Sequence, residues 1–168
     1  EAYRPAFQSA FLQRMCNKLG LPWACEAKPE QVTQVVGRLL ELLASNRVDH
    51  TIFWRRLSLS AQSADYESCR ELFIGASAFD QWLLTYESLA NAHPQGIDVD
   101  LMLRSNPLLI LRNHLAEQAI QSAQQGDFSM VHDLQRVLRH PFDEQPAHSH
   151  WADFPPDWAS SISISCSS

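Results

Sequence analysis

The sequence predicts an all-α fold, an irregular bundle of about eight helices followed by an extended, proline-rich carboxy-terminal tail. Apolar residues recur every three or four positions over most of the chain, which is the spacing of one face of an α-helix. No alternating strand pattern occurs before Ile162 and Ile164, where a short extended segment is the most that we expect. Residues 141–168 hold four of the nine prolines and two of the five tryptophans, a composition that disfavours a helix.

The first two predicted helices are amphipathic. In residues 3–19, large apolar residues recur every four positions, and Gly20 follows where a left-handed helix terminus is expected: Tyr3, Phe7, Phe11, Met15 and Leu19. The second helix runs from Pro29, which suits a first helical turn, to Ser45. Its valines and leucines form a broad apolar face.

Three shorter helices rich in aromatic residues come next. Asp49 is placed to cap the first of them, and the other two are expected over residues 65–74 and 77–90. We expect their aromatic side chains to pack the helices together: Phe53, Trp54, Phe73, Phe79, Trp82 and Tyr86.

Three more helices follow the break at residues 93–96. Asp98 can cap a short helix that ends at Arg104, and Pro107 is expected to open a longer one that ends at Gly126. Asp127 or Ser129 can cap the last helix, which stops at residues 140–141.

These patterns divide the chain into a helical region, residues 1–140, and a tail, residues 141–168. The tail is too aromatic to be freely solvated. We expect it to dock on these helices or on a domain outside the sequence, with Trp151 and Trp158 as anchors.

Composition excludes several classes of partner. The chain has 168 residues and a net charge of −6, with its 13 Lys and Arg dispersed, so no basic stripe for nucleic acid is expected. No apolar run approaches the roughly 20 residues that span a bilayer, so no membrane partner is expected either.

Glu1 in place of an initiator methionine suggests a cut inside a longer protein, whereas the other end looks natural.

Four cysteines are present without a Cys-x-x-Cys pair, and they are too sparse for a disulfide scaffold. This usage favours a reducing compartment, and we expect a cytoplasmic protein. Cys16, Cys25 and Cys69 are predicted to be ordinary buried thiols.

Four phrases occur in fixed order near the end of the chain. They are Asn106-Pro107 leading into Leu111-Arg112-Asn113, then Pro141-Phe142-Asp143-Glu144-Gln145-Pro146, then Pro155-Pro156-Asp157-Trp158, and finally Ser165-Cys166-Ser167-Ser168. Over residues 106–168 the chain resembles the carboxy-terminal region of the SelO/YdiU family, the pseudokinase-fold protein adenylyltransferases. Upstream, Lys18-Leu19-Gly20-Leu21 also resembles the family.

The resemblance implies that the whole protein carries an atypical kinase-like domain outside this sequence. That domain would bind ATP and a divalent metal, Mg²⁺ or Mn²⁺, and transfer AMP to hydroxyl side chains of protein substrates. We expect the present segment to contact that domain, to contain no catalytic residue, to bind no cofactor or metal, and to be inactive alone. Its five glycines lie at least seventeen residues apart, so no phosphate-binding loop is expected, and Asp153-Phe154-Pro155 lacks the glycine of a kinase metal motif.

Cys166 is the candidate site residue. The resemblance implies a redox role through pairing with a cysteine of the kinase-like domain. The residues themselves leave an inert thiol open, because a neighbouring terminal carboxylate disfavours the thiolate.

Other polar residues allow competing interpretations. Four histidines and three carboxylates could bind Zn²⁺ or Fe²⁺, but no established ligand spacing is met, and surface positions are favoured: His132, His140, His148, His150, Asp143, Glu144 and Asp153. Asn106, Arg112 and Asn113 are expected to cap helices or hold the tail, and Asp143 and Glu144 to shape a turn. A different class of function also stays open, a free-standing helical module that binds a partner through the aromatic face from Phe53 to Tyr86.

Overall fold

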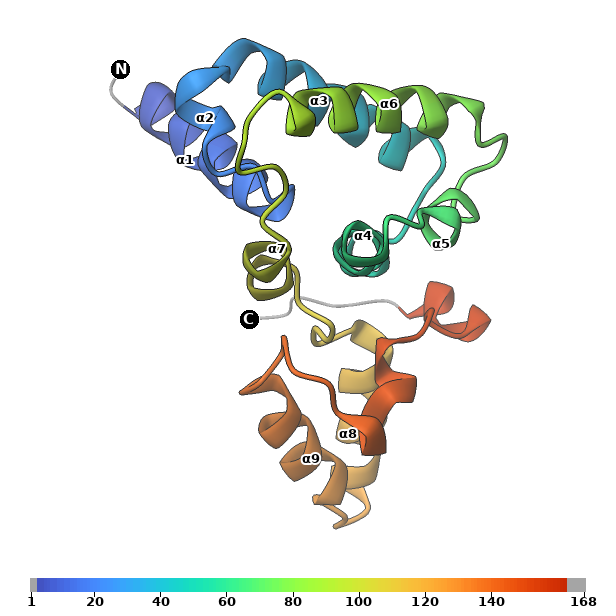
Figure 1. The fold of residues 1–168 in the computed structure, drawn as a ribbon. Helices are drawn as coiled ribbons and strands as arrows, with labels where there is room; N and C mark the ends of the chain where they lie inside the picture. Colours follow the sequence, from blue (N-terminus) through green and yellow to red (C-terminus); the bar gives the residue numbers. More distant parts are fainter. Residues whose placement is uncertain (1–2, 163–168) are drawn as a thin grey trace. The chain divides into compact units, whose positions relative to one another are not determined.

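The computed structural model describes residues 3–162, and it confirms the all-α class: those residues form nine α-helices and two short 3-10 helices, with no strand (Figure 1). Packing divides the chain into two compact units, residues 1–106 and residues 107–168. The sequence instead predicts a division after residue 140, which is based on composition and not on packing. That division stays a prediction.

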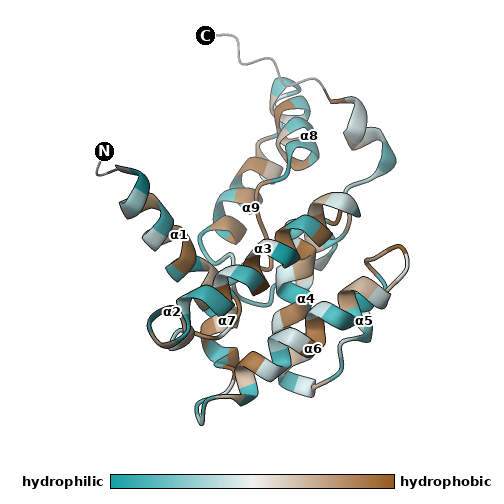
Figure 2. Cartoon of the chain, turned by 90° about the horizontal axis from the view of Figure 1, so that it is seen from above, coloured by the Kyte–Doolittle hydropathy of each residue, from teal (hydrophilic) through white to brown (hydrophobic). Residues whose placement is uncertain are grey.

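The first unit contains seven helices, α1 Tyr3–Lys18, α2 Ala24–Ala27, α3 Pro29–Ser45, α4 His50–Ser63, α5 Glu67–Arg70, α6 Ser77–Asn91 and α7 Val99–Ser105. Two of the expected caps are confirmed. The carboxylate of Asp49 accepts a hydrogen bond from the amide of Ile52 (3.0 Å), and that of Asp98 accepts one from Leu101 (2.8 Å). Apolar and polar stretches alternate along α1 (Figure 2).

An aromatic cluster fills the core of the first unit, as predicted. The ring of Phe53 meets those of Phe73, Phe79 and Trp82 edge-on, with centroids 5.9 to 6.4 Å apart. Trp82 in turn stacks on Tyr86 at 5.3 Å. The side chains of Phe53, Phe79, Trp82 and Tyr86 are fully buried. The face from Phe53 to Tyr86 is therefore occupied by the core, which corrects the hypothesis that it binds a partner.

Two polar groups in this cluster bind backbone carbonyls. The indole nitrogen of Trp82 donates to the carbonyl oxygen of Val35 (2.9 Å), which ties α6 to α3. The hydroxyl of Tyr86 donates to the carbonyl oxygen of Leu19 (2.8 Å), just beyond α1. Burial raises the pKa of Tyr86 well above 10.0, so this hydroxyl stays a donor.

The second unit contains α8 Asn113–Gln124, α9 Ser129–Leu138, and the 3-10 helices η1 Pro146–Ala152 and η2 Asp157–Ser161. Its small core surrounds Trp151 of η1, which is 8% exposed, with Leu109, which precedes α8, and with apolar residues of α8 and α9: Leu115, Ala119, Leu134 and Val137. Trp158 of η2 is 45% exposed and meets His114 edge-on at 6.0 Å.

Several predicted boundaries are wrong. The helix expected from Pro107 begins only at Asn113, because the amides of Leu108 and Leu109 both donate to the carbonyl oxygen of Pro141 (2.8 and 3.1 Å) instead of starting a helix. The helix expected over residues 65–74 shortens to α5, and α2 was not predicted at all. The expected cap of α9 is wrong as well. The carboxylate of Asp127 accepts a hydrogen bond from the amide of Ser129, which is already the first residue of the helix, so neither residue is its cap.

The cysteine prediction was wrong for two of three residues. Cys16 and Cys25 form a disulfide, so neither is a free thiol. Cys69 is a buried thiol as predicted, and burial raises its pKa to about 11. Ile164 and Cys166 lie outside the described residues. Across residues 3–162, no helix combines the length and apolarity that crossing a membrane requires.

Candidate functional site

The phrase Lys18-Leu19-Gly20-Leu21 forms a corner directly after α1. The carbonyl oxygen of Leu19 accepts from Tyr86, that of Gly20 accepts from the amide of Asp98 (2.8 Å), and Leu21 is fully buried. The corner thereby joins α1 to α6 and to the start of α7. We refer to residues 18–21 as the α1 corner.

Gly20 has a backbone conformation and surroundings that exclude a side chain. Its φ is +69°, a left-handed value that favours glycine. A Cβ there would lie 2.8 Å from side-chain carbons of Ile97 and Met102 and 2.9 Å from the carbonyl oxygen of Asp98. The prediction of a left-handed terminus at Gly20 is confirmed, and the close approach of residues 97–102 explains it further.

Asn106 closes the first unit against the α1 corner. Its side chain is fully buried, and its Oδ1 accepts from Nζ of Lys18 (3.0 Å). Its Nδ2 donates to the carbonyl oxygen of Lys18 (2.9 Å) and to the hydroxyl of Ser58 on α4 (2.9 Å). Asn106 therefore links three helices, where the sequence had indicated a helix cap.

The ammonium group of Lys18 occupies a partly buried position in this arrangement. It lies 5.1 Å from the ring centroid of Trp54, a cation–π distance. Burial lowers the pKa of Lys18 below its ordinary value of 10.5. Nearby, a guanidinium nitrogen of Arg55 donates to the carbonyl oxygens of Leu103 (3.4 Å) and Asn106 (3.5 Å).

In the second unit, the phrase at residues 141–146 holds the other elements together. The carbonyl oxygen of Pro141 accepts the two amides of Leu108 and Leu109. The side-chain nitrogen of Gln145 donates to the carbonyl oxygens of Val137 (3.0 Å) and His140 (2.9 Å), which satisfies the carboxy-terminal end of α9. Asp143 lies in the turn, where its amide donates to His140 (3.2 Å).

Residues 110–114, 155–157, 159 and 160 line a groove of about 670 Å³ in the second unit. Arg112 and Asn113, at the start of α8, thus come together with Pro155, Pro156 and Asp157 of the third phrase. His114 beneath them is buried, and its pKa is lowered from 6.5 first by burial and then by the charge of Arg112. Two phrases more than forty residues apart therefore form one surface.

The four histidines that were weighed as possible metal ligands do not come together in one group. His148 stacks on Trp151 at 4.4 Å and His150 meets it edge-on at 5.7 Å, in a cleft of about 620 Å³ between α8, α9 and η1. His132 and His140 are exposed, and Nδ1 of His140 lies 3.6 Å from a carboxylate oxygen of Asp143. Within residues 3–162, no three His, Cys, Asp or Glu side chains are grouped to hold a metal ion.

Within residues 3–162, the α1 corner, Asn106 and residues 141–146 lie at contacts that hold each unit together. Sequence reasoning missed Lys18 and Gln145 as individual residues, although both stand inside phrases that it singled out. A polar residue in such a phrase, next to a helix end, was the signal that could have identified them. Cys166, the predicted redox residue, lies outside the described residues.

Comparison with known proteins identifies the family of the chain. A family model described as "Protein adenylyltransferase SelO" matches residues 1–139. Proteins named protein nucleotidyltransferase YdiU match essentially the whole chain, with 48% identity in Albidiferax ferrireducens, 46% in Variovorax paradoxus and 43% in Thiobacillus denitrificans. The chain covers 34%, 33% and 34% of these relatives, so it spans about a third of their length.

Proposed function

Because this chain belongs to the SelO family of protein adenylyltransferases, we propose that it is the carboxy-terminal helical region of an enzyme that transfers AMP from ATP to hydroxyl side chains of proteins. The observation that carries the proposal is the match along the whole chain, at 48% identity, to a protein nucleotidyltransferase three times as long. ATP and the metal, Mg²⁺ or Mn²⁺, bind a kinase-like domain outside this sequence.

The role of the present region in this proposal is to support the kinase-like domain. The proposal is supported by the contacts that residues of the family-like phrases make within each unit. Asn106 is buried against Lys18 and Ser58, and Gln145 satisfies the end of α9, so these residues maintain the shape of each unit. A region with a fixed shape can hold a neighbouring domain in a constant position. Its partners are that domain and the protein substrates, in the cytoplasm.

The proposal includes a redox role for Cys166. Its support is the resemblance of the last phrase to the family, in which the cysteine near the chain end pairs with a cysteine of the kinase-like domain. A disulfide there would tie the two parts of the protein together under oxidising conditions.

AMP transfer is tested with the whole protein, Mg²⁺ or Mn²⁺, and ATP labelled at the α-phosphate. We expect label to remain covalently on protein, and ATP labelled at the γ-phosphate to leave none, because AMP and not phosphate is transferred. The isolated 168-residue chain should acquire no label. Absence of α-label on the whole protein with both metals would contradict the proposal.

The redox role of Cys166 is tested by comparing labelling with and without a thiol reductant. We expect a reductant to change the extent of labelling of the wild-type protein and to leave the Cys166→Ser variant unaffected. Cys69→Ser serves as the matched control, because Cys69 is buried in the first unit and should not alter the response. Wild-type labelling that does not respond to reductant would exclude the role.

A further inference from the structure

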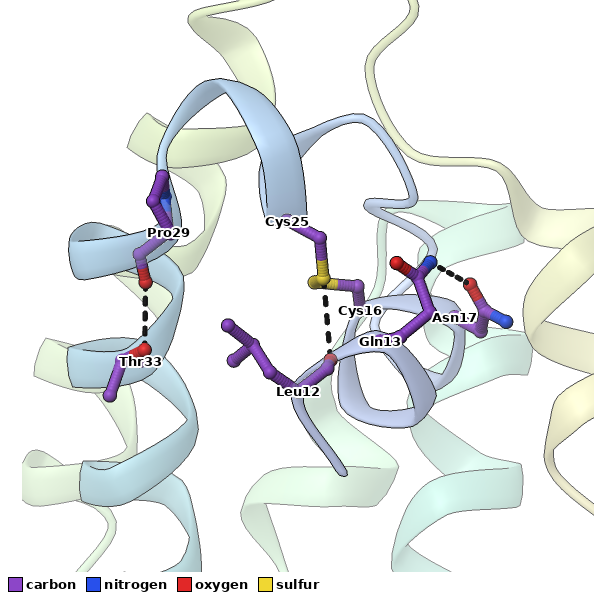
Figure 3. The surroundings of a disulfide bond; sticks show 7 residues. All are labelled: Leu12, Gln13, Cys16, Asn17, Cys25, Pro29 and Thr33. Atoms are coloured by element: carbon purple, nitrogen blue, oxygen red, sulfur yellow. Dashed lines mark hydrogen bonds between the residues drawn. A yellow bond between two sulfur atoms is a disulfide. The ribbon is translucent and has the colours of Figure 1, made fainter. Parts of the chain in front are cut away.

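A disulfide joins the end of α1 to α2 in the first unit. Cys16 lies in the last turn of α1 and is fully buried, whereas Cys25 on α2 is half-buried. Their Cα atoms are 6.2 Å apart, and nine positions separate them in the sequence (Figure 3). The bridge therefore closes one short loop that contains the α1 corner.

Cys25 is the accessible half of this bridge. It lines a groove of about 650 Å³ between α1 and α3, together with Phe7, Phe11, Val36 and Leu40. No charged residue is among the described residues that line the groove. A small reductant that carries no charge besides its thiolate can therefore approach Cys25 from the groove, while Cys16 is fully buried in the core.

The surroundings also suit the reduced state. The Cys25 sulfur lies 3.4 Å from the carbonyl oxygen of Leu12 (Figure 3). Once the bridge is reduced, the Cys25 thiol can donate a hydrogen bond to that oxygen, and the buried Cys16 thiol fits an apolar core. Both redox states thus find favourable contacts without rearrangement of α1.

We propose that Cys16 and Cys25 form a reversible thiol–disulfide exchange site that accepts dithiols of low charge, with Cys25 as the attacked sulfur. The inference rests on the proposed cytoplasmic location, where a disulfide is usually transient or redox-sensing, and it does not depend on AMP transfer or on Cys166.

The dithiol supplies the two electrons that reduce the Cys16–Cys25 bridge. One thiolate of the dithiol attacks the Cys25 sulfur, the Cys16–Cys25 bond breaks, and Cys16 leaves as a thiolate that takes up a proton. The second thiolate of the reductant then attacks the reductant sulfur that is bonded to Cys25. This step closes a cyclic disulfide in the reductant and releases Cys25 as a thiolate, which takes up a proton. The reductant loses two electrons and the bridge gains them. The cyclic disulfide of the same reductant reverses the steps.

Reduction is expected to loosen α2. This helix has only four residues. Among its backbone hydrogen bonds, the amide of Lys28 donates to the carbonyl oxygen of Ala24 (2.9 Å), and the amide of Ala27 donates to that of Trp23 (3.2 Å). Without the bridge, α2 is held to α1 by non-covalent contacts alone, among them the burial of Ala24 and the contact of Cys25 with the carbonyl oxygen of Leu12, so local opening becomes easier.

The site is tested on the whole protein in buffers with graded ratios of reduced to oxidised dithiothreitol, followed by alkylation and mass spectrometry. We expect Cys16 and Cys25 to become alkylated together, with one midpoint, and to return to the bridged form when the ratio is shifted back to oxidised dithiothreitol. Two results would overturn the proposal: alkylation of both residues before any reductant is added, or no alkylation of the native protein at any ratio.

Variants separate this site from other thiols and identify the attacked sulfur. Cys69→Ser and Cys166→Ser should leave the midpoint unchanged. In Cys16→Ser the remaining Cys25 thiol should react with a maleimide more than tenfold faster than the remaining Cys16 thiol in Cys25→Ser; equal rates would exclude Cys25 as the entry point. Hydrogen exchange of residues 21–28 should accelerate on reduction of the wild type and not respond to reductant in Cys16→Ser.

Discussion

Lys18 and Asn106 bind each other in both directions across a separation of 88 residues: the ammonium group of Lys18 donates to the side-chain oxygen of Asn106, whose nitrogen donates back to the carbonyl oxygen of Lys18. Because Asn106 is fully buried, each partner depends on the other to satisfy its polar groups. The pair fixes the end of α7 against the end of α1.

Replacing Asn106 by alanine should destabilise the chain. The variant leaves the carbonyl oxygen of Lys18 and the hydroxyl of Ser58 without this donor, so we expect a loss of about 3 kcal/mol in the free energy of unfolding, measured with urea. Asn113→Ala is the matched control, because Asn113 is exposed on α8, and its change should stay within about 0.5 kcal/mol. Equal effects of the two substitutions would refute a special role for Asn106.

Three glycines allow the cost of a side chain to be separated from the cost of backbone conformation. Gly20→Ala should cost about 3 kcal/mol or more, because the added Cβ meets Ile97, Met102 and Asp98 at a positive φ. Gly75→Ala, at φ +73° in open space, should cost about 1 kcal/mol. Gly37→Ala, helical and in open space, should stabilise by up to about 1 kcal/mol. Urea unfolding measures the order of stability of the three variants. If the Gly20 variant is as stable as the Gly75 variant, the residues around Gly20 move to accommodate the added Cβ.

The disulfide should contribute to stability when it is formed. For a loop of this length, restriction of the unfolded chain corresponds to about 2.5 kcal/mol. We expect the Cys16→Ala/Cys25→Ala variant to unfold at lower urea than the oxidised wild type and to be insensitive to reductant. A variant as stable as the oxidised wild type would show that the bridge does not restrict the unfolded chain.

His114 should make stability depend on pH. Its folded pKa lies below the ordinary 6.5, so the unfolded state binds more protons as pH falls through that value, and the stabilisation present above pH 6.5 is lost toward the lower folded pKa. The free energy of unfolding of wild type should therefore decrease more between pH 7.5 and pH 5 than that of His114→Gln. Parallel pH profiles of the two proteins would contradict the assignment.

Local patterns predicted much of the fold. The apolar spacing before Gly20, the proline that opens α3, and the capping carboxylates Asp49 and Asp98 each act within a few residues of the helix they define. Such features can be read from the sequence because the interactions that favour them are local.

Contacts between distant segments could not be predicted in this way. Pro107 has the local character of a helix start, but the next two amides donate to Pro141, so tertiary contacts outweigh propensity there. The partners Lys18 and Asn106 follow no periodic rule. Cys16 and Cys25 lack a recognised spacing, and only the turn at residues 19–23 brings them together.

The division of tryptophans between the two units gives each unit its own optical signal. Trp23, Trp54 and Trp82 belong to the first unit, and Trp151 and Trp158 to the second. Replacing Trp151 and Trp158 by phenylalanine would leave fluorescence that reports only on residues 1–106. Comparison of its thermal unfolding with that of the unsubstituted chain would then reveal whether the two units unfold together or one after the other.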